Sequence, residues 1–135
     1  MFGIEVELKG KKQMVVEPQD LASVLENVGA EVLSTDRVVL LMELAARKAI
    51  EDRLPEGMMT VGTFIRIKHL AASPLGVKVR GEAHLKKING SELVFEVAAY
   101  DEFERISEGE NEQLIGSVEK FLSRIQKKKS PSFSQ

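Results

Sequence analysis

The chain has no cysteine, no tryptophan and a single tyrosine among its 135 residues. Without cysteine, disulfides, thiolate metal ligands and cysteine nucleophiles are excluded. The scarcity of stacking aromatics argues against a binder of single-stranded nucleic acid, and a net charge of −2 argues against broad phosphate-backbone binding. No apolar run approaches the roughly 20 residues of a membrane span, and the first residues lack a signal-peptide pattern. We therefore expect a cytoplasmic protein with no nucleic-acid and no membrane partner.

The balance of residues that are present favours one globular domain. Hydrophobic residues make up 43% of the chain and charged residues 30%, which is ordinary for a soluble domain of this length. We expect a single domain over residues 1–127. The end of the chain, residues 128–135, is rich in lysine and serine, and we expect a disordered tail there.

A long helix is predicted from residue 34 to about residue 52. Ser34 and Thr35 provide hydroxyl groups that cap a helix start, and Asp36 favours the positive end of the helix dipole. Apolar residues occupy most of the circumference between Val38 and Ile50. Because such a helix has little polar surface, we expect other elements to surround it.

Around this helix, the remaining segments predict strands. From residue 58 onward apolar and polar residues alternate, which is the period of a strand, and Asn89-Gly90 is typical of a hairpin turn. We expect Gly109 to mark a bulge. The predicted strands are 58–70, 77–86, 93–99 and 105–115, with extended segments in 2–16 broken by a turn at 10–12. A short helix is predicted at 21–28 and an amphipathic helix at 117–127.

Two ionisable residues interrupt the apolar pattern. Glu43 lies in the long helix, and His69 shares the alternation phase of Ile65 and Ile67 in a strand. Either residue has an ordinary explanation, a solvated carboxylate or a core histidine bonded to a backbone carbonyl. Burying two ionisable groups is costly unless they are paired, so we favour a functional site. His84 has the opposite phase, and we expect it on the surface.

The predicted architecture is α+β: an antiparallel sheet wrapped around a long central helix, with a C-terminal helix, which is the hotdog fold. The sequence also resembles the fluoroacetyl-CoA thioesterase-like family of hotdog enzymes. The resemblance rests on Val32-Leu33-Ser34-Thr35-Asp36-Arg37-Val38-Val39, on Glu43, on Thr60-Val61-Gly62-Thr63, and on the segment from His69 to Gly76.

The resemblance implies an acyl-CoA thioesterase that releases a carboxylic acid and free CoA. In that family a threonine, a glutamate and a histidine carry catalysis, and a glycine contributes to carbonyl binding. The matching positions here are Thr35, Glu43, His69 and Gly62. The family also implies a homodimer, no cofactor beyond the CoA of the substrate, and no metal. Thr35 has a simpler explanation as a helix cap, and the two roles are compatible if Ser34 caps the helix.

The last predicted strand departs from the family. Members often carry Gly-x-His-x-Arg there, whereas this chain has Gly109-Glu110-Asn111-Glu112-Gln113. The departure supports an alternative function, a non-catalytic module that binds acyl-CoA or another small ligand. A second alternative is an enoyl-thioester hydratase, which would add water to carbon and leave the thioester intact. The sequence does not identify the acyl group.

Overall fold

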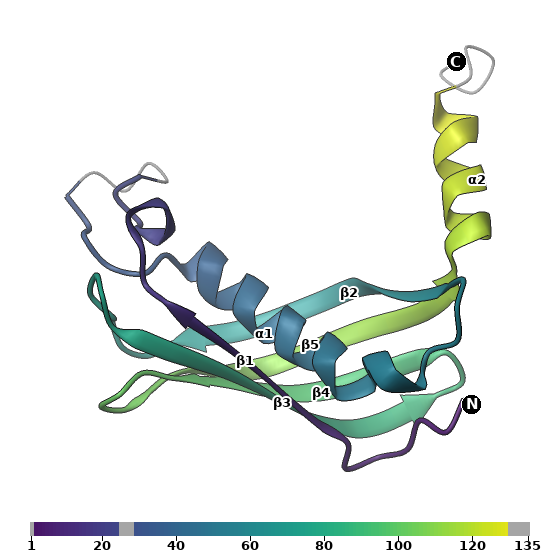
Figure 1. The fold of residues 1–135 in the computed structure, drawn as a ribbon, viewed down its shortest axis with the longest axis horizontal. Helices are drawn as coiled ribbons and strands as arrows, with labels where there is room; N and C mark the ends of the chain where they lie inside the picture. The colour runs from purple at the N-terminus through teal and green to yellow at the C-terminus, as the bar shows by residue number, and fades with distance from the viewer. Residues whose placement is uncertain (1, 25–28, 130–135) are drawn as a thin grey trace.

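The computed structural model describes residues 2–24 and 29–129, and within them one sheet surrounds one long helix (Figure 1). The helix α1 spans Thr35–Ile50 and lies along the concave side of the sheet. The strands are β1 (Lys9–Val15), β2 (Met58–His69), β3 (Lys78–Asn89), β4 (Glu92–Tyr100) and β5 (Arg105–Ser117), with a second helix α2 (Val118–Lys128) and short 3-10 turns at Pro18–Asp20 and Glu51–Arg53.

All strand pairs of the sheet are antiparallel, in the order β1-β3-β4-β5-β2. The two edge strands are therefore β1 and β2. Inward and outward residues alternate along β3 and β4 as the sequence predicts, so that Val79, Ala83, Leu85, Phe95 and Val97 are buried. Because a shift of one residue would reverse the two faces, this alternation fixes the register.

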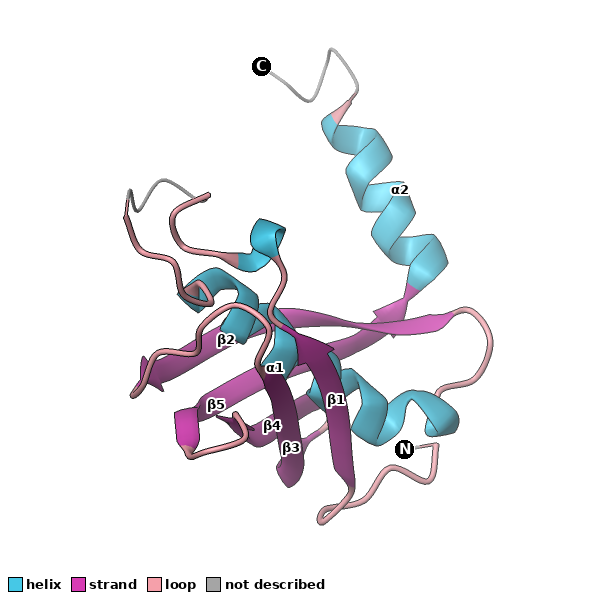
Figure 2. Cartoon of the chain, turned by 60° about the vertical axis from the view of Figure 1, so that its left-hand side comes forward, coloured by secondary structure: helices cyan, strands magenta, loops and turns pink. Residues whose placement is uncertain are grey.

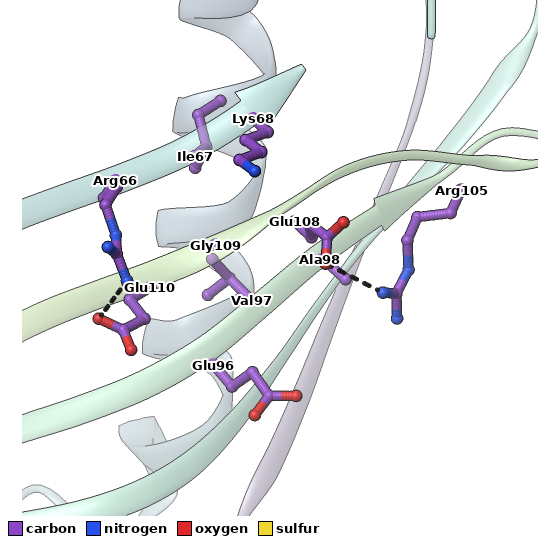
Figure 3. Close-up of a pocket in the computed structure, with 10 residues that line it drawn as sticks. All are labelled: Arg66, Ile67, Lys68, Glu96, Val97, Ala98, Arg105, Glu108, Gly109 and Glu110. Carbon is purple, nitrogen blue, oxygen red and sulfur yellow. Dashed lines mark hydrogen bonds and ion pairs between the residues drawn. The ribbon is translucent and has the colours of Figure 1, made fainter. Parts of the chain in front are cut away.

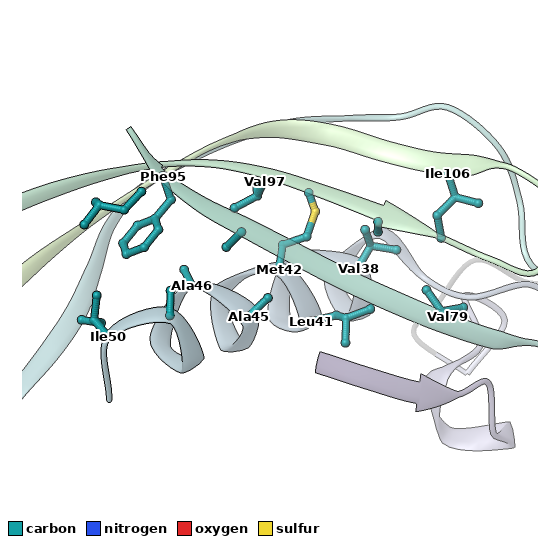
Figure 4. Close-up of a cluster of buried hydrophobic side chains, with 14 of the residues drawn as sticks. Val38, Leu41, Met42, Ala45, Ala46, Ile50, Val79, Phe95, Val97 and Ile106 are labelled. Atoms are coloured by element: carbon teal, nitrogen blue, oxygen red, sulfur yellow. The ribbon is translucent and has the colours of Figure 1, made fainter. Parts of the chain in front are cut away.

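The core forms between α1 and the inner face of the sheet (Figure 4). Val38, Met42, Ala45 and Ala46 of the helix are fully buried there. Burial of each large apolar side chain contributes about 1.5–3 kcal/mol. The helix is less enclosed than its sequence predicts, since Leu40 remains 42% exposed on the side that the sheet does not cover.

Two glycines allow the strands to approach α1 closely. A Cβ atom at Gly10 would lie 2.1 Å from the carbonyl oxygen of Ala45, and one at Gly81 would lie 2.9 Å from the side chain of Leu41. The turn predicted at 10–12 was wrong, because β1 runs straight through these residues. The glycine is required for backbone contact with the helix, not for a change of chain direction.

Other local predictions also need correction. Residues 21–24 are not helical, and the rest of the helix expected at 21–28 lies outside the described residues. Gly109 sits in regular register, and a Cβ there would lie 1.9 Å from the carbonyl oxygen of Arg66. The register shifts lie elsewhere, at Gly62/Phe64, Leu85/Lys87 and Ala99/Tyr100.

The helix α2 projects away from the sheet (Figure 2). Ser117 caps it by accepting a hydrogen bond from the N–H of Lys120, and none of its residues is buried. Phe121 and Leu122 are 42% and 57% exposed. Lys128, expected in the tail, still belongs to this helix, and residues 130–135 lie outside the described part.

Candidate active site

The first polar pair joins the start of α1 to the end of β2. Ser34 caps the helix, its hydroxyl accepting a hydrogen bond from the N–H of Arg37 at 3.2 Å. The hydroxyl of Thr35 therefore serves another contact, and its Oγ1 lies 2.9 Å from Nδ1 of His69. The sequence suggested that one hydroxyl caps the helix and the other points into the site. Ser34 forms the cap, and Thr35 contacts His69.

The other ring nitrogen of His69 has no polar partner. Its Nε2 atom is buried and forms no hydrogen bond with any described residue. Thr35 and His69 line a hollow of about 440 Å³ whose other walls are apolar. A buried nitrogen without a partner is costly, and a polar atom from a ligand or a water would remove that cost.

A second polar pair lies two helical turns further along α1. Glu43 is 23% exposed at its side chain, so the burial predicted for it is only partial. Its Oε2 lies 3.1 Å from the position that a Cβ on Gly62 would occupy. Any larger residue at 62 would press against this carboxylate. Arg47 is the nearest cation, with its NH2 group 3.8 Å from Oε2 of Glu43.

Strand β2 bulges next to this second pair. Gly62 pairs with Gln113, whereas Phe64 pairs with Glu112, so Thr63 is the additional residue. Bulges change the direction of neighbouring groups and often lie beside functional sites. Here the bulge lies at the glycine that faces the Glu43 carboxylate.

Two buried amide side chains of β5 form hydrogen bonds on either side of the bulge. Gln113 and Asn111 of β5 are fully buried. The Gln113 side chain accepts from the hydroxyl of Thr60 at 2.7 Å and donates to Oδ1 of Asn111 at 2.7 Å and to the backbone oxygen of Glu43 at 3.4 Å. Asn111 donates to the backbone oxygen of Phe64 at 3.0 Å. The network thus ties β2 to β5 and α1 on both sides of Gly62.

These two residues occupy the positions where the family pattern has histidine and arginine. Neither lines the hollow beside His69. Their side chains form their hydrogen bonds within the fold. The sequence signal for this was present, because Asn111 and Gln113 share the inward phase of Ile115, but their partners on β2 and α1 were not predictable from spacing.

The loop after His69 is held by Asp101, which sequence reasoning missed. Asp101 accepts from the N–H groups of Phe103 and Glu104 and from the hydroxyl of Ser73, at 2.8–2.9 Å. The backbone oxygen of Ser73 in turn accepts from the N–H of Leu33, just before α1. Burial alone would raise the pKa of Asp101, but these three hydrogen bonds together hold it below its ordinary value.

Within one chain, the four predicted residues form two half-sites. Thr35 contacts His69, and Glu43 faces Gly62. Along α1 the two half-sites are about 12 Å apart, because eight residues separate Thr35 from Glu43 and the helix rises 1.5 Å per residue. Glu43 and His69 are partly buried, as their positions in the pattern predict, but the single chain does not bring all four residues to one point.

The outer face of the sheet carries a different hollow, of about 430 Å³ (Figure 3). Four of its six charged groups are paired, Arg66 with Glu110 and Arg105 with Glu108, each at 3.4 Å. The helix α1 lies behind the sheet in this view, so the hollow is separated from both half-sites.

Across residues 2–24 and 29–129, no group of three or more histidine, aspartate or glutamate side chains is placed to hold a metal ion. No helix in that part of the chain is long and apolar enough to cross a bilayer.

The curled sheet and its central helix define a hotdog-fold protein of the thioesterase class. The family model of the fluoroacetyl-CoA-specific thioesterases matches residues 16–119, and the chain belongs to this family. It is an acyl-CoA thioester hydrolase by this membership. The fold, family and enzyme class predicted from the sequence are confirmed.

Individual relatives agree with this assignment. A fluoroacetyl-CoA thioesterase of Streptantibioticus cattleyicolor is 35% identical over 98 residues, which cover 73% of this chain and 70% of that protein. A thioesterase-superfamily member from Thermus thermophilus has a TM-score of 0.90 at 30% identity and covers 100% of both chains. A mutant of the thioesterase FlK in complex with acetyl-CoA has a TM-score of 0.88 at 28% identity, covering 94% of this chain and 100% of that one.

Proposed function

We propose that the chain hydrolyses an acyl-CoA to a carboxylic acid and free CoA, with Thr35, Glu43 and His69 as catalytic residues and Gly62 at the substrate carbonyl. The observation that carries this proposal is the Thr35–His69 contact, which leaves the buried Nε2 of His69 without a partner. A group in this state is ready to exchange a proton with a substrate or with an attacking water.

The Thr35 contact determines what His69 does. When Nδ1 donates to Oγ1 of Thr35, Nε2 holds a lone pair and accepts a proton from the attacking group. When the hydroxyl donates to Nδ1 instead, Nε2 carries the proton and delivers it to the departing thiolate. Both directions fit the 2.9 Å separation.

Glu43 and Gly62 act on the acyl carbon. The Gly62 N–H polarises the thioester carbonyl as charge develops on its oxygen. Glu43 is either the general base for water or a nucleophile whose oxygen bonds to the acyl carbon as the C–S bond breaks. A single turnover in 18O-labelled water distinguishes the two, since label found in the Glu43 carboxylate would exclude direct one-step hydrolysis.

The working unit in this proposal is a homodimer. Strand β2 is a 12-residue edge strand, and it presents Phe64 at 44% exposure. Natural proteins shorten or cover such edges unless the edges pair. Antiparallel pairing of two β2 strands about a two-fold axis would place the His69 end of one strand alongside the Gly62 end of the other. The two half-sites would then be joined across the interface.

Mixing two inactive variants tests this arrangement. Co-expression of His69→Ala and Glu43→Ala chains gives hybrid dimers that contain one intact composite site. We expect recovery of about a quarter of the wild-type rate, because half of randomly mixed dimers are hybrid and each has one working site of two. No recovery, or a monomer in sedimentation, would contradict a composite site.

The first measurement is thiol release from a panel of acyl-CoAs, short to long, polar and apolar, with fluoroacetyl-CoA included because relatives are named for it. We expect turnover that is lost in Glu43→Ala. Detectable CoA-thioester binding without turnover would favour the non-catalytic module, and water addition with an intact thioester would favour the hydratase. We place the reaction in the cytoplasm, in keeping with a chain that has no cysteine.

A further inference from the structure

A groove of about 550 Å³ lies between α2 and the outer face of the sheet. Met59 and Val61 of β2, with Leu114 of β5, form its apolar wall, and Phe121 and Ile125 of α2 lie opposite. The wall residues of β2 alternate with residues that face the interior, so the groove is on the side of the sheet away from α1 and from the candidate active site. Apolar hollows of this size are typical of binding sites.

The rim of this groove is basic. It consists of Lys120, Arg124 and Lys128, which follow one another at intervals of four residues, so about 6 Å of helix separates each from the next. None of the three forms an ion pair with any residue that the structure describes. We therefore expect an occupant that combines an apolar group with negative charge.

The turn between β4 and β5 has this composition. It carries Phe103, which at 78% exposure is the most exposed large apolar side chain in the described part of the chain. Glu102 and Glu104 flank it, and neither forms an ion pair within that part. Asp101 fixes the turn by accepting hydrogen bonds from the N–H groups of Phe103 and Glu104, at 2.8 and 2.9 Å. A fixed turn that exposes an aromatic ring loses little conformational freedom on binding.

Within one chain, the turn and the groove cannot meet. The turn precedes Arg105, where β5 begins, and α2 follows Ser117, where β5 ends. The strand has 13 residues and is therefore about 40 Å long. The groove of one molecule can receive this turn only from another molecule.

The homodimer proposed above would bring the two features to the same edge. Strand β2 is the edge of the sheet at which the two copies would pair. Figure 1 shows α2 leaving the sheet beside β2 and extending beyond this edge, on the side where the sheet of a second copy would continue. The helix would therefore lie alongside the partner's sheet.

The level of the contact along the strands also agrees. In the proposed pairing, Gly62 of one chain lies beside the partner's His69. Met59 is three residues nearer the start of β2, so it is level with a point three residues beyond the end of the partner's β2. Because Ser107 of β5 pairs with His69 in each chain, the same level on β5 falls in the β4–β5 turn, next to the partner's Phe103.

We propose that the groove binds the β4–β5 turn of a second copy of the chain, with the partner's Phe103 in the apolar part and the partner's Glu102 and the partner's Glu104 at the basic rim. This inference rests on the homodimer of the proposed function. The two-fold axis repeats the contact at both ends of the paired β2 strands, so α2 of each chain holds the other chain. The opposite charges at the rim favour this orientation over others.

Sedimentation over a range of protein concentrations measures the dissociation constant of the dimer. Phe103→Ser should raise it by about tenfold or more, since aromatic anchors in interface pockets carry much of the binding energy. The fold of each chain should be unaffected because the ring is exposed. The matched control is Val15→Ser, which removes a side chain of 45% exposure from β1, the opposite edge of the sheet, and should leave the constant unchanged.

An exchange of charges tests the rim. Arg124→Glu and Glu104→Arg should each raise the dissociation constant by about threefold or more, because each change places like charges together. The two changes combined in one chain should restore the constant to within about twofold of wild type, since opposite charges face each other again. Such recovery would not follow if either change simply damaged the fold.

Cross-linking tests the contact directly and needs no substrate. The chain has no cysteine, so Phe103→Cys/Phe121→Cys carries the only two thiols, and they lie about 40 Å apart within one chain. A short bismaleimide should therefore join them only between chains, and we expect a covalent dimer on a denaturing gel. The control Val15→Cys/Phe121→Cys, with its first thiol at the far edge of the sheet, should give none.

Three results would overturn the proposal. They are a dissociation constant unchanged by Phe103→Ser, charge variants that show no recovery when combined, and a cross-link that is absent or equal in the control. If the wild type is a dimer despite such results, the homodimer stands and the groove is left to another ligand, whereas a wild-type monomer would remove both the homodimer and this contact. Thiol release is a separate readout: a chain that dimerises through the groove yet releases no thiol would retain this inference while the proposed hydrolysis fails.

Discussion

Two polar clusters contact both α1 and β2, and they differ in how completely their hydrogen bonds are satisfied. At the bulge, Gln113 and Asn111 are fully buried, and both bond to neighbours within the fold. At the end of β2, His69 has one bonded ring nitrogen and one that is buried without a partner among residues 2–24 and 29–129. The first cluster is complete within the chain, whereas the second is not.

This difference matches the proposed division between structural and functional polar groups. A buried group that finds its partners costs little, whereas one left without them costs about 1–3 kcal/mol. In the proposed function, the substrate or the attacking water supplies the contact that His69 lacks. Variants at the two clusters should therefore affect different properties, activity at one and stability at the other.

The largest expected effect is on activity, from substitutions in the half-sites. His69→Ala or Glu43→Gln should lower kcat by about 100-fold or more, the usual contribution of a general acid or base. The free energy of unfolding should change little, because neither side chain is fully buried. Steady-state kinetics and urea unfolding measure both. His84→Ala is the matched control, since this second histidine lies on the outer face and contacts Glu7, and a similar loss of activity in it would contradict the assignment.

At the amide network of Gln113 and Asn111, substitutions should lower stability. Gln113→Leu leaves the hydroxyl of Thr60 and the side-chain oxygen of Asn111 without their partner, so the free energy of unfolding should fall by about 1–3 kcal/mol. Urea unfolding measures this directly. The double variant Thr60→Val/Gln113→Leu should be less destabilised than the two single losses added together, because one buried hydroxyl is removed along with its partner. Additive losses would show that Thr60 and Gln113 are not coupled.

Sequence periodicity predicted most of this fold, and the failures have physical causes. Alternation placed Leu85 and Phe95 in the core, and Ser34 was identifiable as a cap, because such signals depend on neighbours in sequence. The function of Gly10 was not predictable, since its partner is a carbonyl of α1 that lies far along the chain. Likewise, nothing in the spacing indicated that Glu43 would face Gly62 while His69 contacts Thr35. Sequence resemblance named the four residues, and their division into two half-sites depends on tertiary geometry.

A smaller effect should follow from Thr35→Val, which removes the hydroxyl that contacts His69. Loss of one hydrogen bond corresponds to about a three- to tenfold lower kcat. Stability should be almost unchanged because Thr35 is exposed and Ser34 provides the cap. Thr35→Ser retains the hydroxyl and should recover most of the rate. A shift in the unfolding midpoint of Thr35→Val, without a loss of kcat, would place this residue with the structural cluster instead.

The smallest effect is expected from Asp101, whose side chain holds the loop after His69. Varying the pH tests whether the charge of this carboxylate contributes to the stability of the loop. Its pKa is lower in the folded state than the ordinary value of 3.8, so the carboxylate stabilises the fold above that pH. This stabilisation is lost as the pH falls through the folded-state pKa. Asp101→Asn should therefore be less stable than wild type at neutral pH, and the difference in unfolding free energy between the two proteins should narrow between about pH 5 and about pH 2.

Ser73→Ala removes one of the three donors to Asp101, and its difference from wild type should be smaller and of the same sign. A gap that is constant with pH would mean that Asp101 holds the loop through neutral hydrogen-bond geometry alone.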